Sequence, residues 1–182
     1  MHMDSITLSL LVSVLIVIII NGLAVWWLGT MLLPYLHFGG PYVPSSPNRV
    51  KLMVEAANIE HGDMIVDIGS GDGRIVIAAA EAGAKKSVGY EIHSGLVKKS
   101  QLSAKMKRVS DKTEFRKQSF WKADLSEFTV VFMFQIPFAM KKISEKLKRE
   151  LPPGARIISN GYDLPGFKEI SSDHQIHVYK NI

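Results

Sequence analysis

The sequence of 182 residues contains no cysteine, so disulfide bonds and thiolate metal sites are excluded. Its six histidines show no His-Glu-x-x-His or similar ligand spacing, and we therefore expect no metal site. Charged residues are almost absent from the first part of the chain, where Asp4 is the only one before Arg49. This absence divides the chain into an apolar N-terminal segment and one globular domain.

The N-terminal segment has the character of a membrane anchor. Residues from Ile6 to Leu33 carry no charge, and roughly 20 apolar residues in a helix span a bilayer core. No polar stripe with helical spacing is visible, and a Trp-Trp pair near the C-terminal end suits a membrane interface. Because proline interrupts the helical hydrogen bonds, Pro34 is expected to end the helix. We expect a transmembrane anchor over residues 5–34.

A cleaved signal peptide is the alternative. It requires a basic beginning and a small-residue cleavage site, whereas the chain begins Met-His-Met-Asp and no Ala-x-Ala-like site follows. A retained anchor is therefore favoured. All lysines and arginines lie C-terminal to it, which predicts a single-pass protein with its domain on the cytoplasmic side. The membrane would be the plasma membrane in a prokaryote or the mitochondrial inner membrane in a eukaryote.

A connector rich in proline and glycine is expected over residues 35–47, before a domain over residues 48–182. Ser46 followed by Pro47 predicts the start of a short helix. The domain is basic, which suits a membrane, a nucleic acid or an acidic protein patch, or is simply a lysine-rich surface.

The rest of the chain alternates between strand and helix patterns. The expected strands lie near residues 64–68, 87–91, 113–119, 129–134 and 155–160, and the expected helices near 74–83, 94–109 and 138–150. Segments 168–170 and 175–179 predict a terminal hairpin. This order indicates an α/β fold, a Rossmann-like and mainly parallel sheet with helices on both faces.

The segment Val66–Arg74, which reads Val-Asp-Ile-Gly-Ser-Gly-Asp-Gly-Arg, ends an apolar strand. A strand, a glycine-rich turn and a helix form the nucleotide pocket of many α/β proteins, because glycines let the backbone approach a ligand closely. The spacing differs from the Gly-x-Gly-x-x-Gly of dinucleotide binders. It resembles the first motif of class I S-adenosylmethionine (SAM)-dependent methyltransferases. The cofactor-binding candidates in this motif are Asp67, Gly69, Ser70, Gly71, Asp72 and Gly73.

An acidic residue ends the next strand. Glu91 could accept both hydrogen bonds of a ribose diol. A phosphate site favours bare N–H groups at a helix start, whereas the carboxylates of Asp67 and Asp72 would repel a pyrophosphate and attract the ammonium group of SAM. The pattern therefore favours SAM over NAD. The two aspartates could instead only cap turns.

Two further strand ends carry candidate residues. Ser119 stands where class I methyltransferases often have an acid that contacts adenine, and Asp124 is a possible substitute. The adjacent aromatic pair, Phe120 and Trp121, could stack on adenine or belong to the core.

Gln135, Ile136, Pro137 and Phe138 follow the fourth strand. Their order resembles the Asn-Pro-Pro-Tyr/Phe motif of enzymes that methylate nitrogen, although glutamine is one methylene longer. Gln135 would then lie where a methyl acceptor binds. An ordinary strand-to-helix turn is the other interpretation.

A further set of segments occurs along the chain in a recognisable order. The segments are the anchor, Pro41–Ser46, Asp67–Arg74, Gly89–Ile92, Phe120–Leu125, Phe134–Pro137, Lys146–Leu151 and Ser159–Pro165. Taken together, they are similar to a narrower family, the membrane-anchored mitochondrial lysine methyltransferases of the ATP synthase c subunit and the ADP/ATP carriers, with their shorter prokaryotic relatives. The resemblance implies that Asp67, Gly69, Gly71 and Glu91 bind SAM. It also implies that residues 41–46, Tyr42 included, close over the cofactor and acceptor. Ser119 and His93 depart from the Asp and Asn typical of the family.

The expected function is that of a membrane-anchored, SAM-dependent protein N-methyltransferase acting on lysine of a membrane-associated protein. Its catalytic candidates are Gln135, Pro137 and Tyr42, and Asp163 is only a weak candidate for a general base. The expected partners are the bilayer and a membrane-protein substrate. No metal is expected, and nucleic acid is disfavoured as a partner.

One alternative is a methyltransferase of a small molecule, lipid or nucleic acid that uses the basic helix Lys98–Arg108. Another is a non-catalytic SAM-binding scaffold.

Overall fold

The computed structural model describes residues 4–36 and 42–182. The chain forms two compact units, Met1–Pro41 and Tyr42–Ile182. Residues 37–41 of the expected connector lie outside the described residues.

The described residues of the first unit, 4–36, form the helix α1 (Ser5–Leu36). Its segment Ile6–Gly29 is long and apolar enough to cross a membrane by length and composition, and its large apolar side chains from Ile6 to Leu28 are exposed. The predicted end at Pro34 is wrong, because the helix continues to Leu36. A proline this close to a helix end removes one hydrogen bond without forcing the next residues off the helical path.

The second unit begins with α2 (Pro47–Ala57). The predicted start is confirmed, since the Ser46 hydroxyl accepts a hydrogen bond from the Arg49 N–H at 3.3 Å. Asn58 ends the helix in the left-handed conformation, with φ of 45°. Val50, Met53 and Ala57 form its buried face, which packs on the sheet.

Seven strands form one sheet in the order β3-β2-β1-β4-β5-β7-β6. The strands are β1 (Met64–Ile68), β2 (Lys86–Glu91), β3 (Thr113–Lys117), β4 (Val130–Met133), β5 (Arg156–Asn160), β6 (Glu169–Asp173) and β7 (Ile176–Lys180). The first five are parallel to one another, and β7 runs antiparallel between β5 and β6. The predicted α/β fold and terminal hairpin are both confirmed.

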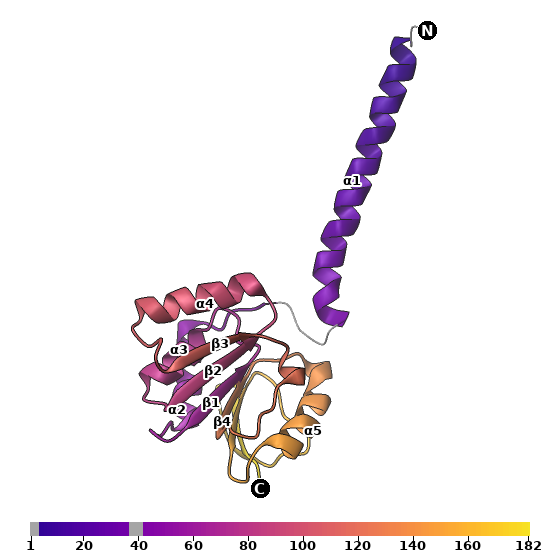
Figure 1. Cartoon of the computed structure of the whole chain (residues 1–182). Helices are drawn as coiled ribbons and strands as arrows, with labels where there is room; N and C mark the ends of the chain where they lie inside the picture. Colours follow the sequence, from indigo (N-terminus) through magenta and orange to yellow (C-terminus); the bar gives the residue numbers. More distant parts are fainter. Residues whose placement is uncertain (1–3, 37–41) are drawn as a thin grey trace. The chain divides into compact units, whose positions relative to one another are not determined.

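Helices cover both faces of this sheet. The remaining helices are α3 (Arg74–Glu81), α4 (Ser94–Met106) and α5 (Met140–Glu150), with two short 3-10 turns, η1 (Phe120–Lys122) and η2 (Pro137–Ala139). α2, α3 and α4 lie on one face and α5 on the other (Figure 1). Each face has its own apolar core, built around Ile65 and Phe132 on the α2 side and around Val66 and Met133 on the α5 side.

Several element ends differ from the predicted ones by a few residues. The third strand ends at Lys117 rather than residue 119, because Ser119 already caps η1. α4 ends at Met106 rather than residue 109, and Arg108 beyond it has a positive φ of 58°. The helix after β4 begins as η2 at Pro137 before α5 continues it.

Candidate active site

The glycine turn lies at the carboxyl ends of β1 and β2. The N–H groups of Gly69 and Ser70 donate hydrogen bonds to the Tyr90 carbonyl at 3.0 and 2.9 Å. The turn therefore folds over the end of the neighbouring strand. Carboxyl ends of parallel strands form the ligand crevice in open α/β sheets, so the predicted motif lies at the edge where a ligand would bind.

Three glycines in this turn have no room for a side chain. Gly69, Gly71 and Gly73 have φ values of +94°, +54° and +78°, which favour glycine. A methyl group on Gly69 would lie 2.7 Å from Gln135 Nε2, and one on Gly71 would lie 2.5 Å from Tyr42 Cε2. The turn thus touches two residues that the sequence predicted for acceptor binding.

Glu91 is buried at the end of β2 and ties the turn to this strand. Its Oε2 accepts a hydrogen bond from the Gly71 N–H at 2.9 Å, and its Oε1 accepts one from the His93 N–H at 2.8 Å. Each carboxylate oxygen keeps a second lone pair. Glu91 can therefore still accept hydrogen bonds from a diol.

Asp67 is the more deeply buried of the two aspartates of the motif, with 3% of its surface exposed. Burial, together with the nearby Glu91 carboxylate, raises the pKa of Asp67 to about 8. No hydrogen bond to its side chain is found among residues 4–36 and 42–182. A buried acid of this kind favours a cationic ligand, which would restore its charge.

Asp72 has a different environment from Asp67. Its two oxygens accept hydrogen bonds from Arg74 Nε and Nη2, both at 2.8 Å, and Lys99 Nζ lies 3.1 Å away. These cations hold the pKa of Asp72 well below its usual range, the Arg74 hydrogen bond being the largest cause. Because two cations already neutralise this carboxylate, Asp67 is the aspartate of the motif that is left to attract an ammonium ligand.

Residues 42–46, called here the strap, lie against this turn. Arg74 Nη1 donates a hydrogen bond to the Ser45 carbonyl, and Arg74 Nη2 lies 3.5 Å from the Tyr42 hydroxyl. Asn160 Nδ2, at the end of β5, lies 3.4 Å from the Ser45 hydroxyl. The strap is thus held from the start of α3 and from the end of β5.

The phenol of Tyr42 is unsuited to act as a base. Burial and the neighbouring Asp72 carboxylate raise the pKa of Tyr42 above its ordinary value, so the hydroxyl keeps its proton at neutral pH. Tyr42 can contribute a ring and a hydrogen-bonding hydroxyl.

Gln135 is buried just beyond β4, and its Nε2 donates a hydrogen bond to the Ile68 carbonyl at 2.5 Å. This bond orients the amide, so that Oε1 is the group left to accept a hydrogen bond. Pro137 follows at the start of η2 and is exposed, as are the neighbouring aromatic side chains Phe134 and Phe138. An oriented acceptor beside exposed apolar groups suits an amine on an alkyl chain.

The residues expected near adenine are spread more widely. Ser119 is half-buried beyond β3, and its neighbour Gln118 donates its N–H to the Glu91 carbonyl at 3.0 Å. Phe120 belongs to the core, and its ring lies 4.6 Å from that of Trp121. Asp124 is exposed and accepts a hydrogen bond from the Ser126 N–H at 2.9 Å, so it caps its own turn.

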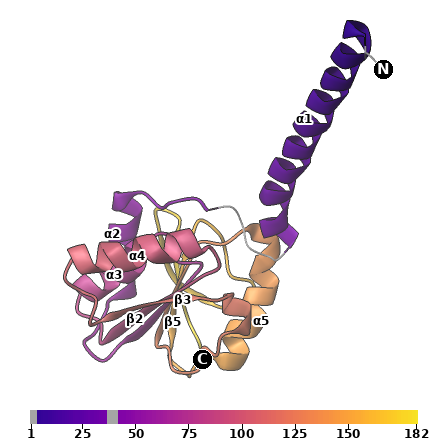
Figure 2. The same ribbon diagram turned by 45° about the horizontal axis from the view of Figure 1, so that its top comes forward.

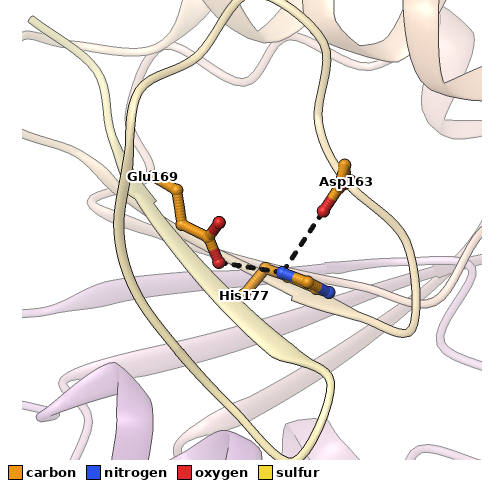
Figure 3. A group of neighbouring side chains, drawn as sticks. All are labelled: Asp163, Glu169 and His177. Carbon is orange, nitrogen blue, oxygen red and sulfur yellow. Dashed lines mark hydrogen bonds and ion pairs between the residues drawn. The ribbon is translucent and has the colours of Figure 1, made fainter.

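The weak base candidate, Asp163, lies beside Glu169 and His177 (Figure 3). His177 Nδ1 lies 3.4 Å from the Asp163 carboxylate and 2.9 Å from the Glu169 carboxylate. The same imidazole nitrogen thus lies close to both carboxylates. The cluster links the loop after β5 to the β6–β7 hairpin.

Ser70 adds a buried polar group to the site. Ser70 Oγ is buried, and it has no hydrogen-bond partner within the described part of the chain. Together with the buried acid Asp67, the tight glycines and Glu91, whose carboxylate could accept hydrogen bonds from a diol, it fits a ligand that is cationic at one end and carries a ribose.

Comparison with known proteins identifies the family. The family model described as the ANTKMT methyltransferase domain matches residues 67–171, more than half of the chain. The chain belongs to the ANTKMT methyltransferase family. It is a SAM-dependent methyltransferase, and the predicted resemblance, enzyme class and cofactor are confirmed.

Two similar proteins support the assignment of the chain to this family. A protein-lysine N-methyltransferase of Saccharolobus islandicus is 33% identical over 148 residues, which cover 76% of this chain and 92% of the relative. A lysine N-methyltransferase of the ATP synthase c subunit, from Xenopus laevis, is 39% identical over 127 residues, 70% of this chain. The match spans only 55% of that relative's own length.

A solved structure has the same fold. An RNA methyltransferase from Salinibacter ruber, in complex with S-adenosyl-L-homocysteine, superposes with a TM-score of 0.73 and 36% identity. The match covers 76% of this chain and 94% of that one.

Two residues at the site were given no role by the sequence pattern. They are Arg74 and Asn160, which hold the strap through Ser45. Both lie inside segments that resemble the family, so the resemblance was the available signal. Nothing local in the sequence shows that they meet Ser45.

Proposed function

We propose that this chain is a membrane-anchored methyltransferase that modifies lysine on a protein at the bilayer surface. The observation that carries this proposal is the covalent order of its parts. Five residues separate α1, which could cross a membrane, from Tyr42, which packs on the glycine turn. A chain of that length reaches no further than about 20 Å, however it is folded.

The residues that would hold SAM are those of the glycine turn, with Asp67, Glu91 and Ser119. Asp67 would face the ammonium group, and Glu91 would accept hydrogen bonds from the ribose hydroxyls. When bound, SAM supplies an electrophilic methyl group. Asp72 would act through Arg74, by holding the strap.

The acceptor amine would be handled by Gln135 and the aromatic side chains around it. A lysine amine has a pKa near 10.4, so its deprotonation costs roughly 4–5 kcal/mol at pH 7. Burial beside a cation lowers that cost, and Gln135 Oε1 would accept a hydrogen bond from the amine and orient it. Tyr42 and Pro137 would shape the site and exclude water.

The relatives' names support a protein acceptor. The Saccharolobus protein is a protein-lysine N-methyltransferase, and the Xenopus protein is named for lysine methylation of the ATP synthase c subunit. We extend lysine as the acceptor from those proteins to this one. The domain would face the cytoplasm of a prokaryote, or the matrix side of the mitochondrial inner membrane.

Labelled SAM and membranes that lack this enzyme provide the test. The full chain should produce methyl-lysine in membrane proteins, detected by mass spectrometry, and Glu91→Ala should not. A matched variant, Ile16→Arg with Ile19→Arg, keeps the domain but opposes membrane insertion of α1. If this variant methylates soluble and membrane proteins as the parent does, proximity to the bilayer is not part of the function. Label in RNA instead of protein would reject lysine as the acceptor.

A further inference from the structure

The helix α4 and the turn after it form a basic surface on the side of the sheet that α2, α3 and α4 cover. Residues 94–109 contain no acidic residue. Their five basic residues are Lys98, Lys99, Lys105, Lys107 and Arg108. Figure 2 shows α4 along the outside of the domain.

Two of these cations are used within the domain. Lys99 pairs with Asp72 at 3.1 Å, and Lys107 pairs with Glu81 at 3.4 Å. Within residues 4–36 and 42–182, the other three have no ion-pair partner. They remain available to a ligand outside the domain.

Apolar side chains lie between the lysines. The inner face of α4 is buried through Val97, Ser100 and Ala104, whereas Leu102 and Met106 are 60% and 68% exposed. These two side chains are one helical turn apart and therefore lie on one face of the helix. Lys98 and Lys105 lie on the same outer side, since each is one turn from Leu102.

We propose that this outer face of α4 docks on an anionic lipid bilayer, with Leu102 and Met106 inserted between headgroups and the lysines on the lipid phosphates. The inference depends on the proposed membrane location of the protein. Basic residues near an anionic leaflet strengthen association by about fivefold each. An apolar face flanked by lysines is typical of helices that lie in the membrane interface.

A nucleic acid fits this face less well. α4 offers no aromatic side chain on which a base could stack, and phosphate contacts would leave Leu102 and Met106 in water.

The position of α4 also favours the bilayer. Lys99 binds Asp72 beside the glycine turn on which Tyr42 packs, so α4 lies next to the point where the domain joins the segment that leads to α1.

The absence of cysteine permits a direct test in the full chain. Leu102→Cys carries an environment-sensitive dye on the proposed face, and Glu145→Cys carries it on the exposed side of α5, across the sheet. Each labelled chain is reconstituted in vesicles of phosphatidylcholine alone or mixed with phosphatidylserine. We expect a blue shift at residue 102 only in the anionic vesicles, and none at residue 145.

Two charge reversals provide the second arm. Lys98→Glu with Lys105→Glu, combined with the dye at residue 102, should weaken docking by at least about 25-fold, while SAM binding stays unchanged. The inference is overturned if the dye gives no shift in anionic vesicles, if it shifts equally at residue 145, or if the reversals leave the shift intact. A shift caused by single-stranded RNA but not by anionic lipid overturns it in favour of nucleic acid.

Vesicle flotation separates this inference from the proposed function. A chain that floats with neutral vesicles but shows no dye shift in anionic ones retains its anchor and refutes only the role of α4. A chain that fails to float with neutral vesicles refutes the anchor, whereas a dye shift in anionic vesicles would still support α4.

Discussion

Glu91 Oε2 accepts a hydrogen bond from the main-chain N–H of Gly71 at 2.9 Å, which joins the last residue of β2 to the centre of the glycine turn. Removal of the carboxylate would leave that N–H unpaired and would remove the proposed ribose contact. We expect Glu91→Ala to lower SAM affinity at least about 100-fold, given roughly 1.5–3 kcal/mol per hydrogen bond to a charged group. Calorimetric titration with SAM measures this. Glu91→Gln should lose less, and an unchanged affinity in Glu91→Ala would remove Glu91 from the site.

Gly71 has no space for a side chain, because a methyl group there would lie 2.5 Å from the Tyr42 ring at a φ of +54°. Gly71→Ala should therefore displace Tyr42 and strain the turn, with a cost of about 1–3 kcal/mol. SAM binding should weaken by about tenfold or more. Gly95→Ala is the matched control, because its methyl group would meet nothing within 4 Å. Equal behaviour of the two variants would show that the strap does not depend on Gly71.

The raised pKa of Asp67 leads us to expect that SAM binding is coupled to proton release. Its pKa of about 8 keeps it protonated at pH 7, and an ammonium group beside it would favour the ionised form. Binding should then release close to one proton, and affinity should rise nearly tenfold per pH unit between about pH 6 and 7. Above about pH 7.8 the ammonium group of SAM itself loses its proton, and the rise ends. Calorimetry in buffers of different ionisation enthalpy counts the protons, and Asp67→Asn should release none.

Arg74 should act as a positioning residue, since it connects Asp72 to the Ser45 carbonyl. Arg74→Gln should loosen residues 42–46 and raise the KM for SAM by about tenfold, with a smaller effect on kcat. Hydrogen exchange of the amides of Val43 and Ser45 provides a structural measurement. Lys99→Gln is the control, because it also removes an ion pair from Asp72 but leaves the bond to Ser45. Faster exchange in both variants would locate the effect in Asp72 instead.

We expect loss of the Gln135 amide to impair the methyl-transfer step. Gln135→Leu keeps the size of the side chain but removes Oε1 and the bond to the Ile68 carbonyl. We expect kcat to fall about 100-fold, because a small misplacement of reacting groups can cost that much. SAM affinity measured by calorimetry should change by less than about threefold, because the proposed role of Gln135 is to position the acceptor amine and not the cofactor. Gln135→Glu would test the role of charge. Unchanged turnover of Gln135→Leu would exclude the amide from catalysis.

The fold could be predicted wherever the local pattern was strong. The strand over residues 64–68 was predicted with its observed bounds, because an apolar run meets a glycine turn there. The helix expected near residues 74–83 is also present and ends at Glu81, shortly before Gly83, which has a φ of +104°. The helix after β4 was less predictable, because Pro137 first imposes a short 3-10 turn.

The site was predictable where its residues stand at the ends of recognisable strands. Asp67 and Glu91 lie at two strand ends, and parallel pairing brings such ends together. The strap depends on Arg74 and Asn160, which are 29 and 115 residues away from Ser45. The sequence pattern does not show that Arg74 and Lys99 neutralise Asp72. Such partners become visible only once the chain is folded.

The strap described above has a kinetic consequence. Each methyl transfer consumes one cofactor, so the spent molecule must leave before the next can bind. If the strap covers the cofactor, the bonds of Ser45 to Arg74 and Asn160 must open once per turnover. Lid opening often limits turnover in such enzymes. We therefore expect a burst, with one rapid methyl transfer per enzyme molecule followed by a slower steady rate that the exchange of the cofactor sets.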